Sequence, residues 1–519
     1  MKKTENYKLS LRKKRLSDYI FYKRNLKKKD DLIQNSIYNI NFDCINLPIS
    51  QKEKKYLNAE NFFQDMFLYL KSENYEEVKF SLISLKEFFS NDKINIDENI
   101  NIIDNILECM KKYINDKIIL YQGLWILVNY SFYSNKNECF TSANSFCLFE
   151  YIISMNDIEL FCLILWLFHN ITTYENKENN DLNYVIITSN IFKNKILRLL
   201  DKEELINHIN DENSVYKDII LKGFNLFLNL IKCERQNLDD VEKLEIKQIK
   251  QQMIKIELKF IDTNIEIIYN IILENIISYF DFFDDSFPSK IISVNLIEKI
   301  LLEKKFISNS STLILKNRVI GNFLSVNDIT DLNLIDNIFN FEYSILSNTK
   351  ISEEKIDVYW TLGNLISCSD SISDLLIQKK EFIELIIKDF REDSNKIEIR
   401  ELLITLEKII VNANFNNFVI LAQIGTFDEL IGGLLRFEKD ENLLVYIFLN
   451  ISFFIEKGDI IKKYTDNTNI VLNKFNEKGG KDLLMKYQNC KCENLKNVVE
   501  KIWNRFYLNE DFISNIEME

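Results

Sequence analysis

Turn-forming residues are scarce in this sequence. Ten glycines and two prolines, Pro48 and Pro288, occur in 519 residues. Compact β-sheet proteins need many turn residues, so this scarcity argues against a β fold and favours helices. The chain also exceeds the size of one ordinary globular core, which leaves several domains or a repeat architecture.

Residues suited to metal or phosphate chemistry are also few or scattered. The two histidines, His169 and His208, lie far apart in sequence, which argues against a His-based metal or catalytic cluster. The nine cysteines have no regular spacing and are expected as free thiols in a reducing compartment. Neither G-x-x-x-x-G-K nor G-x-G-x-x-G occurs. We therefore predict no enzymatic activity, no cofactor and no metal site.

Long hydrophobic runs are missing as well. The most apolar short run, FCLILWLF at 161–168, is far shorter than the about 20 apolar residues that span a bilayer. The N-terminal charges are not followed by an apolar run, so no secretory signal is predicted. These features predict a soluble intracellular protein without membrane contact.

Positive charge is concentrated at the N-terminus. The chain carries a net charge of −13, yet residues 1–31 hold twelve Lys or Arg against four Asp or Glu. We predict a basic, largely flexible arm over residues 1–55 and a short acidic tail over 511–519. Charge alone would also suit an arm that binds RNA or an acidic membrane surface. The arm has no stacking aromatics in a Gly-rich pattern, and the acidic remainder would repel phosphate, so direct nucleic-acid binding is not expected.

An internal repeat is the strongest signal. The segments LWILVNYSFYS (124–134), LWLFHNITTYE (165–175) and YWTLGNLISCS (359–369) each place Asn four residues after Trp. Asn129 and Asn170 are 41 residues apart, and Asn322 and Asn364 are 42 apart. A period near 42 is typical of armadillo or HEAT repeats. Weaker copies of the unit contain Asn225 with Asn229, Arg318 with Asn322, Tyr279, Lys408, and Tyr446 with Asn450.

The repeat predicts an all-α protein. Between Asn170 and Asn322 the intervals are stretched, which we interpret as insertions near 175–215 and 234–262. The expected fold over residues 56–510 is a right-handed armadillo-repeat solenoid of about ten repeats, preceded by the basic arm.

Within a unit the helical period separates two faces. Leu124, Leu127 and Val128 form an i, i+3, i+4 stripe that should pack on neighbouring helices. Trp and Asn, four apart, share an adjacent face that would line a groove. A single Trp or Asn of this kind is more often a core residue. Recurrence favours an exposed row, because an unpaired buried amide costs roughly 1–3 kcal/mol. Such a row could clamp a peptide backbone and hold Lys or Arg stems between indoles.

On these elements the chain resembles importin alpha, the armadillo adaptor that carries nuclear localisation signals. The resemblance covers nearly the whole chain. It includes the basic arm, the Trp-x-x-x-Asn units and a closing repeat at 476–507. It also includes the family's irregular fifth and sixth units, here Ser278 with Tyr279, and Arg318 with Gly321, Asn322 and Asp328.

The resemblance implies two peptide-binding areas. The residues that match the family's major area are Trp125, Asn129, Trp166, Asn170 and Asn229. Those that match the minor area are Arg318, Asn322, Asp328, Asp357, Trp360, Asn364 and Glu401. The chain departs from the family pattern at Asn225, Tyr174, Tyr133 and Glu138 in the first area and at Ile404 and Lys408 in the second. We therefore expect the minor area to contribute more than in ordinary members.

The resemblance also gives the arm a partner. The cations expected to bind importin beta are Arg12, Lys13, Lys14, Arg15, Lys23, Arg24, Lys27, Lys28 and Lys29. The segment LIQNSIYN at 32–39 has no cation where the family has Lys-Arg-Arg, so we predict weak autoinhibition.

The predicted function is that of a nuclear import adaptor that shuttles between cytoplasm and nucleus. It would bind cargo with Lys/Arg-rich localisation signals, importin beta through its arm, and an export receptor through its last repeats. The alternative is a degenerate armadillo scaffold that binds another extended peptide and has no import activity.

Overall fold

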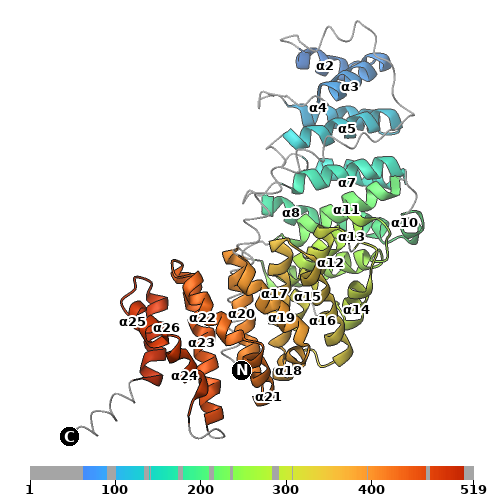
Figure 1. Cartoon of the computed structure of the whole chain (residues 1–519). Coiled ribbons are helices and arrows are strands. Elements are labelled where there is room, and N and C mark those ends of the chain that lie inside the picture. The colour runs from blue at the N-terminus through green and yellow to red at the C-terminus, as the bar shows by residue number, and fades with distance from the viewer. Residues whose placement is uncertain are drawn as a thin grey trace, which may run out of the picture. The chain divides into compact units, whose positions relative to one another are not determined.

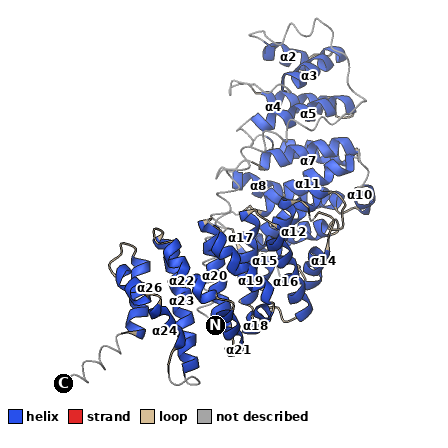
Figure 2. Cartoon of the chain, viewed as in Figure 1, coloured by secondary structure: helices blue, strands red, loops and turns tan. Residues whose placement is uncertain are grey.

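The computed structural model describes most of the chain after the N-terminal region, and every regular element in the described part is a helix (Figure 2). The all-α prediction is confirmed for these residues. The described ranges are 62–89, 101–133, 140, 142–173, 179–209, 215–233, 238–282, 291–306, 308–393, 395–462 and 468–507. The predicted arm, with its nine importin-beta-binding cations, and the predicted acidic tail lie outside them.

The chain divides into two compact units, 1–283 and 284–519. The helices of the first unit are α2 (Phe62–Leu70), α3 (Tyr75–Phe89), α4 (Ile102–Lys112), α5 (Lys117–Tyr133), α6 (Ala143–Ser154), α7 (Ile158–Thr172), α8 (Asn179–Thr188), the π-helix η3 (Phe192–Ile196), α9 (Leu197–Leu200), α10 (Glu203–His208), α11 (Val215–Ile231), α12 (Asp240–Leu258) and α13 (Glu266–Phe282).

The helices of the second unit are α14 (Val294–Leu302), α15 (Ser310–Val326), α16 (Leu332–Asn348), α17 (Ser352–Ile366), α18 (Asp370–Gln378), α19 (Lys380–Glu392), α20 (Lys396–Asn412), α21 (Phe415–Gln423), α22 (Thr426–Arg436), α23 (Glu441–Lys462), α24 (Ile470–Glu477), α25 (Gly480–Tyr487) and α26 (Glu493–Phe506).

Each unit is a stack in which long helices pack against the next one along the chain (Figure 1). In the first unit the order is α3, α5, α7, α11 and α13, and in the second it is α15, α17, α20, α23 and α26. Other helices, most of them shorter, lie between successive members of these stacks in the sequence. Packing between sequence neighbours is the arrangement of a helical repeat solenoid.

Helix α7 shows how the sequence produces this stack. Asp157 caps its N-terminus by accepting hydrogen bonds from the backbone N–H groups of Glu159 and Leu160. Most of the helix is apolar and buried, since it packs between α5 and α11. Trp166, His169 and Asn170 are half-buried, as are the first two residues of the helix. One helix face therefore stays open while the others pack.

The segment expected as an insertion at 234–262 is instead part of the stack. It contains α12, which begins with a capping box between Asp239 and Glu242 and packs against α11 and α13. Most of its charged positions face solvent, and its buried positions, which include Lys250 and Glu257, recur at helical spacing from Ile246 to Glu257. The extra residues near 175–215 likewise include helices, α8 to α10.

No single helix in the described ranges is long and apolar enough to cross a bilayer. Helices α21 and α22 reach that length and composition only when taken together, and they bend by 54° at their junction.

Candidate functional site

Three helices place the Trp and Asn of their pair on one half-buried face. Residues between the two are mostly buried, so the pair borders the packed surface of the stack. The half-buried positions are Trp125 and Asn129 in α5, Trp166 and Asn170 in α7, and Trp360 and Asn364 in α17. In α15, Asn322 is more enclosed than these residues and only 6% exposed.

The repeated Asn residues join adjacent long helices. Asn170 donates its side-chain N–H to the carbonyl of Val128 at 3.1 Å, and Asn364 donates to that of Gly321 at 3.0 Å. In both cases the acceptor precedes the Asn of the previous repeat. Lys408 takes the same part in α20, since its Nζ donates to the carbonyl of Gly363 at 2.7 Å. The row therefore stabilises the stack, a role that residue spacing did not reveal.

Two other members of the predicted row, Tyr279 and Asn450, lie in a different register. In these two helices the donors are Asn275 and Asn450, which bond to the carbonyls of Phe224 and Leu403. Each of these carbonyls lies five residues before the residue of the preceding long helix that is equivalent to Asn364, namely Asn229 or Lys408. Thr361 and Thr405 make the same kind of bond, since their hydroxyls donate to the backbone carbonyls of Asn317 and Tyr359. These carbonyls lie five residues before Asn322 and Asn364.

Asn450 and Tyr279 are therefore wrong as members of the row, and both are fully buried. Asn275 and Asn450 take the place of Thr361, which comes three residues before Asn364. The positions equivalent to Asn364 are therefore Ser278 and Phe453. For Asn450 the error arises because the inward and outward positions are one helical turn apart and both can hold Asn, whereas Tyr279 is directly adjacent to the equivalent position Ser278.

The first unit carries an aromatic row bounded by lysines. The rings of Trp125 and Trp166 meet edge to face with centroids 5.7 Å apart. Tyr121 stacks on Trp125 at 6.2 Å. Lys86 Nζ lies 5.2 Å from the Trp125 ring, and Lys222 Nζ lies 4.3 Å from the Trp166 ring. We call Lys86, Trp125, Trp166 and Lys222 the capped indole row.

Asn229 in α11 bonds to the end of α7. Its side-chain N–H donates to the hydroxyl of Thr172 at 3.1 Å and to that of Thr173 at 3.3 Å. Asn225 donates to the carbonyl of Leu221 within its own helix. Tyr174 and Glu138, two of the positions at which the sequence departs from the family pattern, lie outside the described residues. The side chain of Tyr133, a third such position, lies outside them as well.

The second unit brings several of its predicted residues together around an arginine. Arg318 in α15 forms ion pairs with Glu353 at 2.9 Å and with Asp357 at 2.8 Å, both in α17. The ring of Trp360 lies against Gly321, where an added Cβ would be 2.6 Å from it. Arg318, Asp357, Trp360 and Asn364 are thus close neighbours.

Glu401 and Asp328 lie at the edges of this group. Glu401 in α20 is 3% exposed and pairs with Arg400 at 3.0 Å. Asp328 is exposed in the segment that follows α15. Ile404, where a further Trp was expected, is buried.

A buried carboxyl lies behind the same helices. Asn317 donates to Glu342 at 3.2 Å, and Thr361 donates to Asn317 Oδ1 at 2.6 Å. Glu342 is fully buried, and burial raises the pKa of its carboxyl well above the ordinary value. A protonated carboxyl in this position can donate as well as accept. The first unit has a counterpart in Glu257, which is also fully buried and accepts from Asn275.

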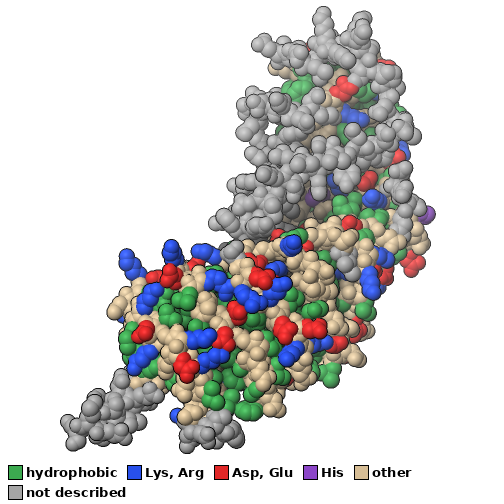
Figure 3. Space-filling view, in the orientation of Figure 1, with side chains coloured by type: hydrophobic (Ala, Val, Ile, Leu, Met, Phe, Trp, Pro, Cys, Tyr) green, Lys and Arg blue, Asp and Glu red, His purple; other side chains and the backbone are tan. Residues whose placement is uncertain are grey.

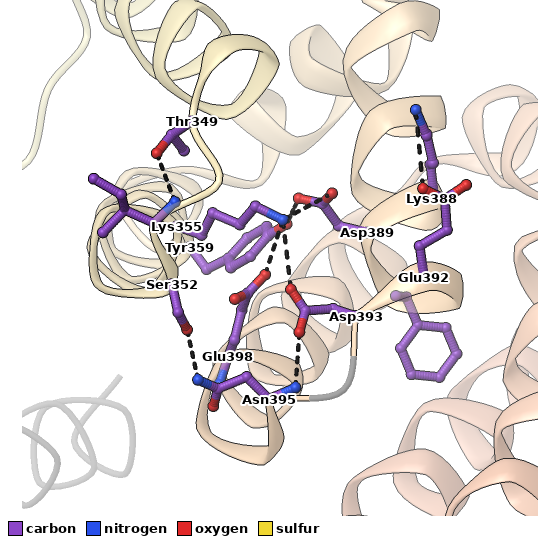
Figure 4. Close-up of polar contacts among 12 residues, drawn as sticks. Thr349, Ser352, Lys355, Tyr359, Lys388, Asp389, Glu392, Asp393, Asn395 and Glu398 are labelled. Carbon is purple, nitrogen blue, oxygen red and sulfur yellow. Dashed lines mark hydrogen bonds and ion pairs between the residues drawn. The ribbon is translucent and has the colours of Figure 1, made fainter.

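A second cluster was missed by the sequence analysis. Lys355 in α17 lies among Asp389 and Asp393 from the α19 region and Glu398 from α20 (Figure 4). The three Nζ–oxygen distances are 3.2, 3.5 and 3.2 Å. Tyr359 donates its hydroxyl proton to Asp389 at 2.7 Å. Burial, followed by the Asp393 carboxyl, raises the pKa of Glu398 to about 7. Spacing along one helix could not reveal a cluster assembled from three elements.

The surface of the second unit carries both signs of charge. Figure 3 shows basic and acidic side chains interspersed over apolar ones on the face of this unit turned to the viewer. Among the described residues, no group of three or more His, Cys, Asp or Glu is placed to hold a metal ion. The Trp/Asn faces and the charged groups around them can recognise a ligand through aromatic rings, amides and charges.

Comparisons with known proteins concern the fold. No protein-family model matches the chain, and no characterised protein matches it by sequence. One similar solved structure is that of an engineered protein from the Northeast Structural Genomics Consortium, with a TM-score of 0.59, 13% identity, and coverage of 85% of this chain and 98% of that one. A second engineered protein from the same consortium has a TM-score of 0.39 and 12% identity, and covers 48% of this chain and 97% of its own. At such identity the first likeness extends to fold alone.

Proposed function

We propose that this chain is a nuclear import adaptor of the importin-alpha type, built as a right-handed armadillo solenoid of about ten repeats. The five stacked long helices found in each unit support that number of repeats. Lys/Arg-rich localisation signals bind along the Trp/Asn faces. The basic arm, residues 1–55, recruits importin beta, the last repeats bind an export receptor, and the complex passes between cytoplasm and nucleus.

The observation that carries this proposal is the Trp360 face of the second unit. Trp360 offers a ring for an aliphatic Lys or Arg stem, and Asn364 offers an amide oxygen beside it. Glu353, on the same helix, is 36% exposed, and besides its ion pair with Arg318 its carboxylate can accept a hydrogen bond from the cationic head of the ligand. A ring, an amide and a carboxylate on one helix together fit an extended cationic peptide.

The first unit suits such a peptide less well. Its two indoles already have Lys86 and Lys222 beside them. Like charges across a binding surface oppose association. We assign the larger share of peptide binding to the second unit, where the carboxylates of Glu353 and Asp357 lie on the same helix as Trp360.

Calorimetry with a capped hexapeptide of Lys and Arg tests this assignment. Trp360→Ala should weaken binding by about tenfold, the size expected for loss of one cation–π contact with its apolar area. Trp166→Ala should have a smaller effect. Trp503→Ala, which removes an indole in α26, is the matched control and should leave affinity unchanged. A larger loss from Trp166→Ala would refute the assignment.

The degenerate scaffold is the second candidate, and one observation favours it. The amide N–H groups of Asn170 and Asn364 are used between helices, which leaves fewer donors for a peptide backbone. A pulldown with the full chain and with residues 56–519 separates the two functions. The adaptor predicts recovery of importin beta by the full chain alone and of basic-peptide cargo by both. Recovery of neither partner would favour the scaffold. Weak autoinhibition predicts that removal of residues 1–40 raises cargo affinity less than tenfold.

A further inference from the structure

The two tryptophans of the first unit are covered by lysines of the chain itself. Lys222 of α11 reaches back to the ring of Trp166 in α7 and lies 4.3 Å from its centroid. Lys86 of α3 reaches forward to α5, where it lies 5.2 Å from the Trp125 ring and 5.9 Å from that of Tyr121. Four successive long helices therefore supply lysine, indole, indole and lysine in order.

The lysines are held in place by their surroundings. Both side chains are half-buried, and burial lowers the pKa of each amine. Asp218 lies four residues before Lys222 on α11, and its charge opposes that lowering. An ammonium group over a ring at this depth is stabilised by the ring quadrupole, and more strongly than at a fully exposed site.

We infer that Lys86 and Lys222 are specificity-determining residues that occupy, from inside the chain, the ring faces on which a peptide cation would otherwise lie. The inference rests on the proposed function only in naming a cationic peptide as the ligand. An incoming Lys or Arg must displace a tethered lysine that is already in contact, and it meets the like charge of that lysine. The capped indole row therefore disfavours Lys/Arg-rich peptides.

The contact itself can be tested without any peptide. In a Trp360→Phe/Trp503→Phe background the emission comes from Trp125 and Trp166 alone, because the chain has four tryptophans. Quenching by caesium ions is compared with quenching by neutral acrylamide, so that a change in exposure is separated from a change in charge. Lys222→Ala should raise the caesium-to-acrylamide ratio of quenching constants by about twofold, because a local positive charge repels cations.

Matched variants make this measurement specific. Lys255→Ala removes one exposed cation from α12 in the same unit and should leave the ratio unchanged. Lys222→Arg keeps a cation over the ring and should keep the wild-type ratio. An unchanged ratio in both Lys222→Ala and Lys86→Ala would overturn the inference.

The consequence for recognition is measured in a Trp360→Ala background, which removes the ring of the second unit. There Lys86→Ala/Lys222→Ala should bind the Lys/Arg hexapeptide about tenfold more tightly than the background protein, and Lys255→Ala should not. If wild type binds the peptide but the double substitution gives no gain, the inference fails and the proposed function stands. If no variant binds the peptide, the proposed function fails, and the quenching ratio alone decides whether the lysines cap the indoles.

Discussion

The side-chain N–H of Asn364 in α17 donates to the backbone carbonyl of Gly321 in α15, with nitrogen and oxygen 3.0 Å apart. This bond links two adjacent long helices, since the carbonyl of Gly321 within α15 accepts it in addition to its place in the helix. Asn364→Ala should lower the free energy of unfolding by about 1 kcal/mol, the usual net worth of such a bond. Urea unfolding followed by circular dichroism measures the change.

A matched substitution separates this bond from a general effect of asparagine. Asn504 is exposed in α26, so Asn504→Ala should be neutral or slightly stabilising through helix propensity. Equal losses in the two variants would show that the Asn364 bond contributes nothing.

The indole of Trp360 depends on a glycine for its position. A Cβ added at Gly321 would lie 2.6 Å from the ring and 2.8 Å from the hydroxyl of Thr361. Gly321→Ala should therefore displace Trp360 and cost about 1–3 kcal/mol, more than the gain in helix propensity returns. Gly432→Ala in α22 is the control, because nothing lies within 4 Å of its added Cβ. It should stabilise the protein by up to about 1 kcal/mol. Thermal unfolding of both variants tests the pair, and a stabilised Gly321→Ala protein would contradict the packing.

The sequence was sufficient for the helical class because the apolar period is visible within single segments. In 161–168 nearly every position is buried, and the break in the pattern at Trp166 marks the open face. Spacing also indicated that Trp and Asn share a face. It could not show whether a carbonyl of the previous helix lies within reach of the Asn170 amide.

The remaining errors of the sequence-based prediction also concern contacts between helices. Asn450 was placed one helical turn before the equivalent position Phe453, because an inward and an outward polar position look alike in one sequence, and Tyr279 was placed next to the equivalent position Ser278. Lys222 and Trp166 are 56 positions apart, so their contact depends on how α7 and α11 pack. The cluster around Lys355 likewise joins residues from three elements (Figure 4).

The pair of Arg318 and Asp357 should be strongly coupled. Their side chains are 14% and 10% exposed and lie 2.8 Å apart. Arg318→Met leaves the carboxylate facing a methionine and should cost about 2 kcal/mol or more. Asp357→Asn in that background should recover part of the loss, with a coupling energy of about 0.5–3 kcal/mol. A double-mutant cycle by urea unfolding measures it.

A surface pair provides the comparison for this cycle. Lys388 and Glu392 are 4.0 Å apart and more than half exposed. Lys388→Met should change stability by less than about 0.5 kcal/mol. Additive effects of Arg318→Met and Asp357→Asn would mean that the buried pair is not coupled.

Glu398 should make the stability of the second unit depend on pH. The carboxyl is 1% exposed, and burial with the neighbouring Asp393 raises its pKa from 4.5 to about 7. Because the folded state binds this proton more tightly than the unfolded state, the stabilisation is complete below pH 4.5 and is lost as pH rises to 7. The loss is of the order of 3 kcal/mol across that window. Lys355, 3.2 Å away, opposes the shift but does not cancel it.

Glu398→Gln removes the titrating proton while keeping the shape of the side chain. Urea unfolding at pH 5 and pH 8 should show that wild type loses more stability over this interval than Glu398→Gln does. Glu392→Gln, an exposed substitution on the adjacent α19, should retain the wild-type pH dependence. Because Glu398 joins α20 to Lys355 of α17, a pH dependence that persists unchanged in Glu398→Gln would place the proton on another buried carboxyl, with Glu342 the next group to replace.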